Sequence, residues 1–291
     1  MGSLSGIFIA LVVTLGVSAL FIFGVFDADD GLPAIENSSD NIAESASQST
    51  IDHNSVAESP NARAVVFALD MSGSRNDALS VSAKDRAQEL TNDLTAWSPG
   101  NTLPFPDSIA DVRTRSDFQK ATTTTAIKKL SSNDYFGIVF FAERSEAWSD
   151  TLVQATPMNV AKVVRTIEKY AIGESTLGHK TNLEGAFGTI FRLIETGHHG
   201  EEQERSHADV YIFMDGYVSA GRHAVDWESS SNHAALNLQY GENMHTLVNE
   251  IASRATKLQA IVNTVGIGEG CDTHTLRQLA QKSGGRYYDY R

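Results

Sequence analysis

The chain has a single cysteine, Cys271, among its 291 residues. One thiol excludes an internal disulfide framework, and it also excludes zinc sites that need two or more cysteines. Cys271 stands in an expected loop after Glu269-Gly270, with neither a flanking cation nor a C-x-x-C partner to activate it. We therefore expect no chemical role for this residue.

Positive charge is also scarce, because 23 Lys and Arg stand against 36 Asp and Glu, for a formal net charge of −13. A nucleic-acid-binding protein needs a basic surface that displaces counterions from phosphates, so this composition argues against nucleic acid as a partner. Residues 27–63 hold eight of the acidic residues and one basic residue, Arg63. They have almost no large apolar side chains, which predicts a disordered, self-repelling linker.

Residues 7–26 lack charge altogether and read IFIALVVTLGVSALFIFGVF. As a helix, this segment would span about 30 Å, the thickness of the hydrocarbon core of a bilayer. The alternatives are a cleaved signal peptide, for which the apolar run is too long, and a buried helix. We predict a transmembrane anchor in residues 1–26. Because three aspartates follow it directly, we expect a single-pass protein of the cell membrane whose domain lies on the non-cytoplasmic side, periplasmic or extracellular.

Apolar runs of strand length alternate with segments of helical period over residues 64–291. Runs rich in β-branched and aromatic residues are typical of strands covered on both faces, as in a parallel sheet. The alternation predicts an α/β fold, a doubly wound and mostly parallel sheet flanked by helices in a Rossmann-like arrangement. The expected strands are 64–69, 136–142, 210–214, 260–267 and 286–290, and the expected helices include 117–130, 160–167, 183–194 and 276–280.

Two long stretches interrupt this alternation, residues 75–116 and 217–244. The first contains a possible helix at 79–97 and then several prolines, and the second is polar with little periodicity. Both follow the carboxyl end of an expected strand, where doubly wound folds bind ligands. We therefore hypothesise that these inserts form a rim that selects a partner, the alternative being passive, solvated insertions.

Side chains with oxygen ligands follow the expected strands. The first strand runs into Asp70-Met71-Ser72-Gly73-Ser74, the third ends at Asp215, and Thr181 precedes the helix that begins at 183. Carboxylates and hydroxyls are hard ligands that suit Mg²⁺ or Ca²⁺. Each element also has an ordinary structural interpretation. Ser72 or Ser74 could cap a helix while Asp70 accepts a turn amide, Asp-Gly is a common turn pair, and T-x-x-E at 181–184 matches a capping box.

Taken together, these positions make the sequence similar to von Willebrand factor A (VWA) domains with an intact metal-ion-dependent adhesion site. The similarity extends over residues 64–290 and includes the passages 136–141, 180–183, 265–268 and 284–288. It implies one bound Mg²⁺, with Mn²⁺ or Ca²⁺ also possible, and a protein partner whose Asp or Glu carboxylate completes the coordination. The ligands that the resemblance implies are Asp70, Ser72, Ser74, Thr181 and Asp215.

Enzymatic interpretations fit the same residues less well. A phosphatase of the haloacid dehalogenase type would need a second aspartate as general acid–base where Ser72 stands. A serine hydrolase would need Gly-x-Ser-x-Gly, but Asp70 replaces the first glycine, and no P-loop motif is present. A zinc site at His198, His199 and His207 is conceivable, but without a helical H-x-x-x-H pair we favour a solvated loop.

The sequence thus predicts a membrane-anchored VWA-type binding module, not an enzyme, that recruits a protein partner through a divalent cation. The first alternative is a structural or assembly component of an envelope or surface complex, in which the metal stabilises the fold. A metal-dependent hydrolase is the less favoured alternative.

Overall fold

The structure is a computed structural model that describes residues 62–79, 112–170, 177–197, 207–227 and 232–291, all within the compact unit Ser55–Arg291. The expected anchor, nearly all of the acidic linker, most of the possible helix at 79–97 and two of the three candidate zinc histidines lie outside these residues. Within the described part, no helix is both long enough and apolar enough to cross a membrane.

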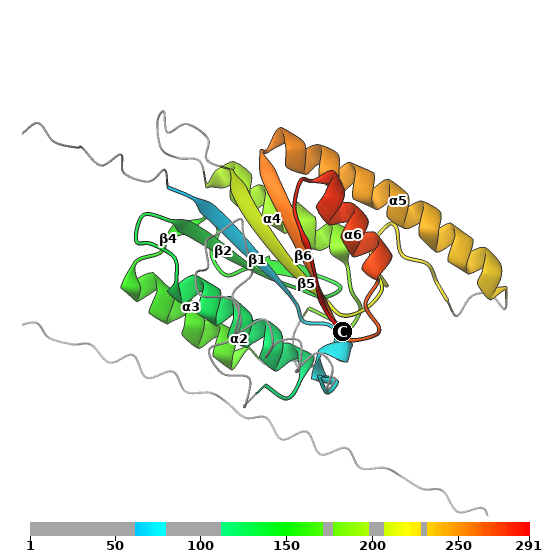
Figure 1. The fold of residues 1–291 in the computed structure, drawn as a ribbon, viewed down its shortest axis with the longest axis horizontal. Helices are drawn as coiled ribbons and strands as arrows, with labels where there is room; N and C mark the ends of the chain where they lie inside the picture. The colour runs from blue at the N-terminus through cyan, green and yellow to red at the C-terminus, as the bar shows by residue number, and fades with distance from the viewer. Residues whose placement is uncertain (1–61, 80–111, 171–176, 198–206, 228–231) are drawn as a thin grey trace, which may run out of the picture. The chain divides into compact units, whose positions relative to one another are not determined.

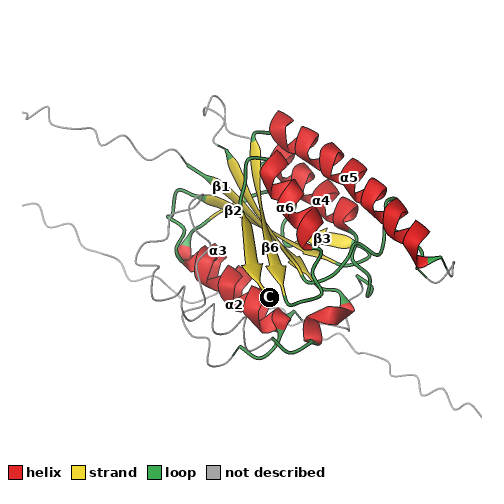
Figure 2. Cartoon of the chain, turned by 45° about the vertical axis from the view of Figure 1, so that its right-hand side comes forward, coloured by secondary structure: helices red, strands yellow, loops and turns green. Residues whose placement is uncertain are grey.

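A sheet forms the centre of the domain (Figure 2). Its seven strands lie in the order β3-β2-β1-β5-β6-β7, with β4 also paired to β2. Five strands run parallel, which confirms the predicted doubly wound and mostly parallel sheet. The other two strands pair antiparallel with β2, and they were not predicted because segments of two or three residues leave no periodic pattern. The parallel strands are β1 (Ala64–Asp70), β2 (Tyr135–Phe141), β5 (Ala208–Met214), β6 (Ala260–Ile267) and β7 (Tyr287–Tyr290), and the antiparallel ones are β3 (Ser145–Ala147) and β4 (Val153–Gln154).

Helices cover both faces of the sheet (Figure 1). One face carries α2 (Arg115–Lys128) and α3 (Pro157–Lys169), and the other carries α4 (Leu183–Thr196), α5 (His233–Lys257) and α6 (Thr273–Lys282). A short 3₁₀ helix, η1 (Gly73–Asn76), follows β1. The helix α2 begins at a complete capping box of Thr114 and Asp117, which explains why it starts before the predicted residue 117.

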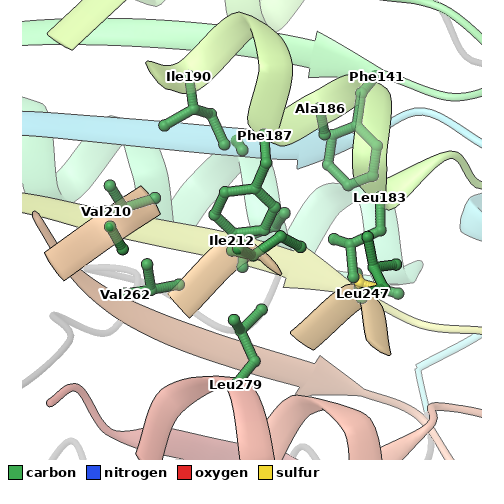
Figure 3. Packing of buried hydrophobic residues seen from close by; sticks show 14 of the residues in the cluster. Phe141, Leu183, Ala186, Phe187, Ile190, Val210, Ile212, Leu247, Val262 and Leu279 are labelled. Carbon is green, nitrogen blue, oxygen red and sulfur yellow. The ribbon is translucent and has the colours of Figure 1, made fainter. Parts of the chain in front are cut away.

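The side chains of β1 alternate between two apolar clusters. Val66 and Ala68 join the cluster beneath α4, α5 and α6, whereas Val65, Phe67 and Leu69 join the cluster beneath α2 and α3. Every residue of β1 is buried, as expected for a strand at the centre of a sheet that is covered on both faces. Figure 3 shows part of the first cluster, where Phe187 and Ile190 of α4 pack near Val210 and Ile212 of β5.

The stretch 217–244 was expected to be irregular, and its second half is instead the start of α5, which begins at His233. Asn232 caps this helix by accepting a hydrogen bond from Ala235 N. The helical pattern of apolar residues is weak here, because the first half of α5 buries only one side chain per turn, at Leu236, Tyr240 and Met244. The insert in the described chain is therefore confined to the segment between β5 and Asn232.

The ends of the 75–116 insert meet at its base. Ala78 and Thr114 form an antiparallel bridge, and Leu79 N donates a hydrogen bond to Arg113 O at 2.9 Å. Leu79 and Val112 are both buried in the core. These residues belong to the domain itself, so any insert proper lies within residues 80–111.

Cys271 lies in the turn between β6 and α6 and is buried. Its Sγ lies 3.9 Å from the hydroxyl of Tyr287. Burial raises the pKa of the Cys271 thiol, which disfavours the reactive thiolate. The environment therefore agrees with a packing role for this side chain.

Gly285, between α6 and β7, permits a close approach of two backbone segments. A Cβ atom built at this position would lie 2.0 Å from the carbonyl oxygen of Val262 in β6. Gly285→Ala should therefore lower the free energy of unfolding by at least about 3 kcal/mol, because backbone atoms would have to move apart. The matched control is Gly188→Ala on the exposed face of α4, where a Cβ meets nothing within 4 Å. Urea denaturation of both variants measures the difference, and equal stabilities would contradict this prediction.

Candidate metal centre

The Asp70-to-Ser74 segment turns sharply where β1 ends. Ser72 N donates a hydrogen bond to Asp70 Oδ1 at 2.8 Å, so Asp70 does accept the turn amide that the ordinary interpretation assigns to it. The ordinary interpretation also has Ser72 or Ser74 cap a helix, and for Ser72 this is wrong. This residue stands at the N-cap position of η1, but its side chain makes no capping hydrogen bond. The Ser72 hydroxyl instead lies 3.4 Å from the hydroxyl of Ser74.

Asp215 joins this group from the end of the neighbouring strand. β1 and β5 are adjacent and parallel, so their carboxyl ends meet at one sheet edge. Ser74 Oγ donates a hydrogen bond to Asp215 Oδ1 at 2.8 Å, across 141 positions of the sequence. The structure therefore brings together four of the five predicted ligand residues, Asp70, Ser72, Ser74 and Asp215, through side-chain and turn hydrogen bonds.

Thr181, the fifth predicted ligand, is 3% exposed and lies on the loop before α4. Two backbone connections attach this loop to the other segments. Gly73 N donates to His179 O at 3.0 Å, and Ser219 N donates to Thr181 O at 2.9 Å. The capping-box interpretation of 181–184 is wrong, because the N-cap of α4 is Asn182, whose side chain accepts from Gly185 N. The Thr181 hydroxyl is thus not needed to cap the helix.

Glu143, just after β2, holds the same loop and was missed by the sequence analysis. Its Oε1 accepts hydrogen bonds from His179 N at 3.2 Å and Lys180 N at 3.3 Å. These backbone donors lower the pKa of the Glu143 carboxyl. Its backbone carbonyl also accepts from Asn182 Nδ2 at 3.0 Å. Glu143 therefore positions the loop that presents Thr181.

Arg115, the first residue of α2, is the second residue that the sequence analysis missed. Its Nη1 lies 3.3 Å from Asp215 Oδ2 and 3.4 Å from Asp77 Oδ2, and its side chain is only 15% exposed. The guanidinium packs against Gly268, whose φ of 76° favours glycine and where a Cβ would lie 2.5 Å from Arg115 Nε. Arg115 stands 100 positions before Asp215, so no local sequence signal could have linked them.

No protein-family model matches the sequence, and no curated protein matches it as a relative. Solved structures with a similar arrangement include VWA-type domains.

The similar structures include a von Willebrand factor type A protein from Catenulispora acidiphila, with 14% identity and a TM-score of 0.46, where the match covers 79% of this chain and 39% of that one. An aerotolerance-related membrane protein from Bacteroides fragilis has 13% identity and a TM-score of 0.46, and the match covers 78% of this chain and 90% of that one. BatB from Bacteroides thetaiotaomicron has 12% identity and a TM-score of 0.46, and the match covers 78% of this chain and 89% of that one. At such low identities and scores, these likenesses transfer neither family membership nor function to this chain.

The predicted VWA-type ligands fit a hard divalent cation by burial and by chemistry. Asp70, Ser72 and Asp215 are 0%, 2% and 1% exposed, although carboxylates at the surface of a loop are normally solvated. Burying a carboxylate is costly unless an opposite charge compensates it, and Arg115 supplies one such charge to Asp215. The remaining donors are hydroxyl oxygens, which Mg²⁺ and Mn²⁺ accept as ligands. Both the position and the donor set therefore suit Mg²⁺.

Proposed function

We propose that this chain is a VWA-type binding module that recruits a protein partner through a divalent cation, Mg²⁺ in the first instance. Asp70, Ser72, Ser74, Thr181 and Asp215 would hold the ion, which supplies a positive centre for an Asp or Glu carboxylate of the partner. The observation that carries the proposal is the hydrogen bond between Ser74 and Asp215, which joins the first and third predicted ligand segments at one sheet edge.

A recruiting role fits the local structure better than the alternative in which the metal stabilises the fold. The three ligand segments are already joined by hydrogen bonds between protein groups, at Gly73–His179, Ser74–Asp215 and Ser219–Thr181. An ion is therefore not needed to bring the loops together. We accordingly propose that the metal acts on a partner, as part of a protein without catalytic activity.

The membrane location stays part of the proposal. Residues 7–26 would anchor the chain as a single-pass membrane protein, and residues 27–63 would hold the domain away from the bilayer on the non-cytoplasmic side. A protein extract for partner searches should accordingly come from membranes together with the material on that side.

The proposal predicts that the full-length chain, immobilised as bait, retains at least one membrane or surface protein in Mg²⁺ and releases it in EDTA. The Asp70→Ala variant should retain none of it in either condition, because the ion would be lost. Thermal melting is measured in both buffers. A domain that stays folded in EDTA supports recruitment, whereas unfolding in EDTA at the assay temperature supports the structural alternative and contradicts ours.

The same experiment tests the rim hypothesis for the inserts. Leu79, Val112 and Thr114 belong to the core or to the α2 cap, so the replacement should span residues 80–111 alone. With a short Gly/Ser link in their place, we expect Mg²⁺ affinity within about threefold of the wild type, under 1 kcal/mol. Retention of the partner should fall at least about tenfold, because the open cation by itself discriminates little between carboxylates. Unchanged retention would identify the insert as passive.

A further inference from the structure

A second group of metal-ligand side chains lies on the loops that carry Thr181 and Asp215. His223 stands in the connection between β5 and α5, and its side chain is 9% exposed. Among the described residues, its buried Nε2 finds no hydrogen-bond partner. Such a nitrogen is uncommon, because an unsatisfied polar atom in the interior is costly. The imidazole is therefore available to a ligand.

Two glutamates face this nitrogen from different helices. Glu184 belongs to the first turn of α4 and Glu250 to α5, and one ligand atom from each of the three side chains lies within 4.8 Å of the others. His223 Nε2 and Glu250 Oε2 are 3.4 Å apart. Zn²⁺ bonded at about 2.0–2.2 Å would hold neighbouring tetrahedral ligands about 3.3–3.6 Å apart. The distance between His223 Nε2 and Glu250 Oε2 already lies in this range. The half-exposed glutamate side chains can rotate to shorten the distances from Glu184 to the other two ligand atoms.

Hydrogen bonds hold the loop that carries His223 in place without help from a ligand. Asn243 Nδ2 of α5 donates a hydrogen bond to His223 O at 3.2 Å. The neighbouring backbone amide, Arg222 N, donates to Glu184 Oε2 at 3.2 Å. The loop is thus fastened to both helices that carry the glutamates, and this preorganisation favours metal binding.

A protein cation already lies between the two carboxylates. Arg222 Nη2 lies 2.9 Å from Glu184 Oε1 and 2.7 Å from Glu250 Oε2. The Arg222 side chain is 63% exposed, so it can move into solvent at little cost. The guanidinium shows that this position attracts positive charge, but it leaves the His223 nitrogen without a hydrogen bond, whereas a metal ion would bond to all three side chains.

We propose that Glu184, His223 and Glu250 form a second divalent-cation site that binds Zn²⁺ in preference to Mg²⁺ and displaces Arg222. An imidazole with carboxylates suits Zn²⁺, whereas a set made only of oxygens suits Mg²⁺. Glu184 follows Thr181 by three positions and His223 follows Asp215 by eight. Bound zinc would therefore tie two of the segments that carry the first site to α5.

The test is a calorimetric titration of the full-length chain with Zn²⁺, repeated with Co²⁺, whose visible spectrum reports tetrahedral nitrogen and oxygen ligation. His223→Gln and Glu250→Gln should each weaken the affected site at least tenfold, and Arg222→Gln should strengthen it severalfold. Matched controls are His245→Gln, at an exposed histidine of α5, and Glu195→Gln, whose carboxylate pairs with Arg254 on the surface. Both controls should bind Zn²⁺ as the wild type does.

Wild-type Zn²⁺ binding by both His223→Gln and Glu250→Gln would overturn the proposal, as would an equal loss in the two controls. Glu250 is half-exposed, so its variant remains informative if the buried His223 variant fails to fold. The Asp70→Ala, Asp215→Ala double variant should keep the zinc site. This result separates a failure of the zinc proposal from a failure of the proposed Mg²⁺ site.

Discussion

Asp215→Ala in the full-length chain should abolish Mg²⁺ binding, so that a calorimetric titration which shows one site in the wild type shows none in the variant. Asp215 is one of two buried carboxylates among the five proposed ligands, and it also positions the Ser74 hydroxyl through their 2.8 Å hydrogen bond. Alanine removes both effects at once. Asp70→Ala should have the same outcome, because the Asp70 side chain also fixes the turn through Ser72 N.

The matched control is Asp150→Ala, which removes one carboxylate from an exposed position after β3. It should bind Mg²⁺ with wild-type affinity. Thermal melting in EDTA confirms that each variant is folded before titration. If Asp70→Ala and Asp215→Ala are folded and still bind Mg²⁺ like the wild type, these residues are not the ligands.

Arg115→Gln should raise Mg²⁺ affinity about tenfold, equivalent to about 1.4 kcal/mol. In the described structure, the Arg115 guanidinium lies 3.3 Å from Asp215 Oδ2, so a divalent cation at Asp215 meets a like charge or must displace it. The neutral amide removes that competition. The same substitution should destabilise the chain in EDTA by about 3 kcal/mol, because a buried carboxylate loses a charged partner.

Arg113→Gln is the control for this prediction, since Arg113 is exposed two positions away and its loss changes the net charge equally. It should alter neither Mg²⁺ affinity nor stability in EDTA by more than about 0.5 kcal/mol. Equal affinities of Arg115→Gln and the wild type would show that the guanidinium does not compete with the ion. A parallel rise in the control would show a general charge effect instead.

Local patterns were sufficient to predict most of the fold. The strands β1, β2, β5 and β6 are buried on both faces, and such strands appear in the sequence as continuous apolar runs. The helix α4 was equally clear, because Leu183, Phe187, Ile190 and Ile194 share one buried stripe. By contrast, α5 was not predicted, since its first half buries few side chains and carries Gly241 in its interior.

Four of the five candidate ligands could be predicted because they stand at strand ends, whereas Thr181 was found by its place before an expected helix and by the family resemblance. Asp70, Ser72, Ser74 and Asp215 follow buried strands, so adjacent parallel strands place them at one edge. No sequence pattern of this kind indicated Arg115, Glu143 or the group of Glu184, His223 and Glu250. Their roles depend on side-chain contacts between residues 27 to 100 positions apart, which no local pattern encodes.

The proposal rests on one divalent cation at the edge shared by β1 and β5, and anomalous X-ray scattering from Mn²⁺ in crystals of the chain tests it most directly. Mn²⁺ has the ligand preferences of Mg²⁺ and scatters anomalously. We predict a peak within about 2.5 Å of ligand oxygens of Ser72 and Ser74, between Asp70 and Asp215. Crystals at saturating Mn²⁺ with no peak at this position, or with peaks only elsewhere, would contradict the proposed metal centre.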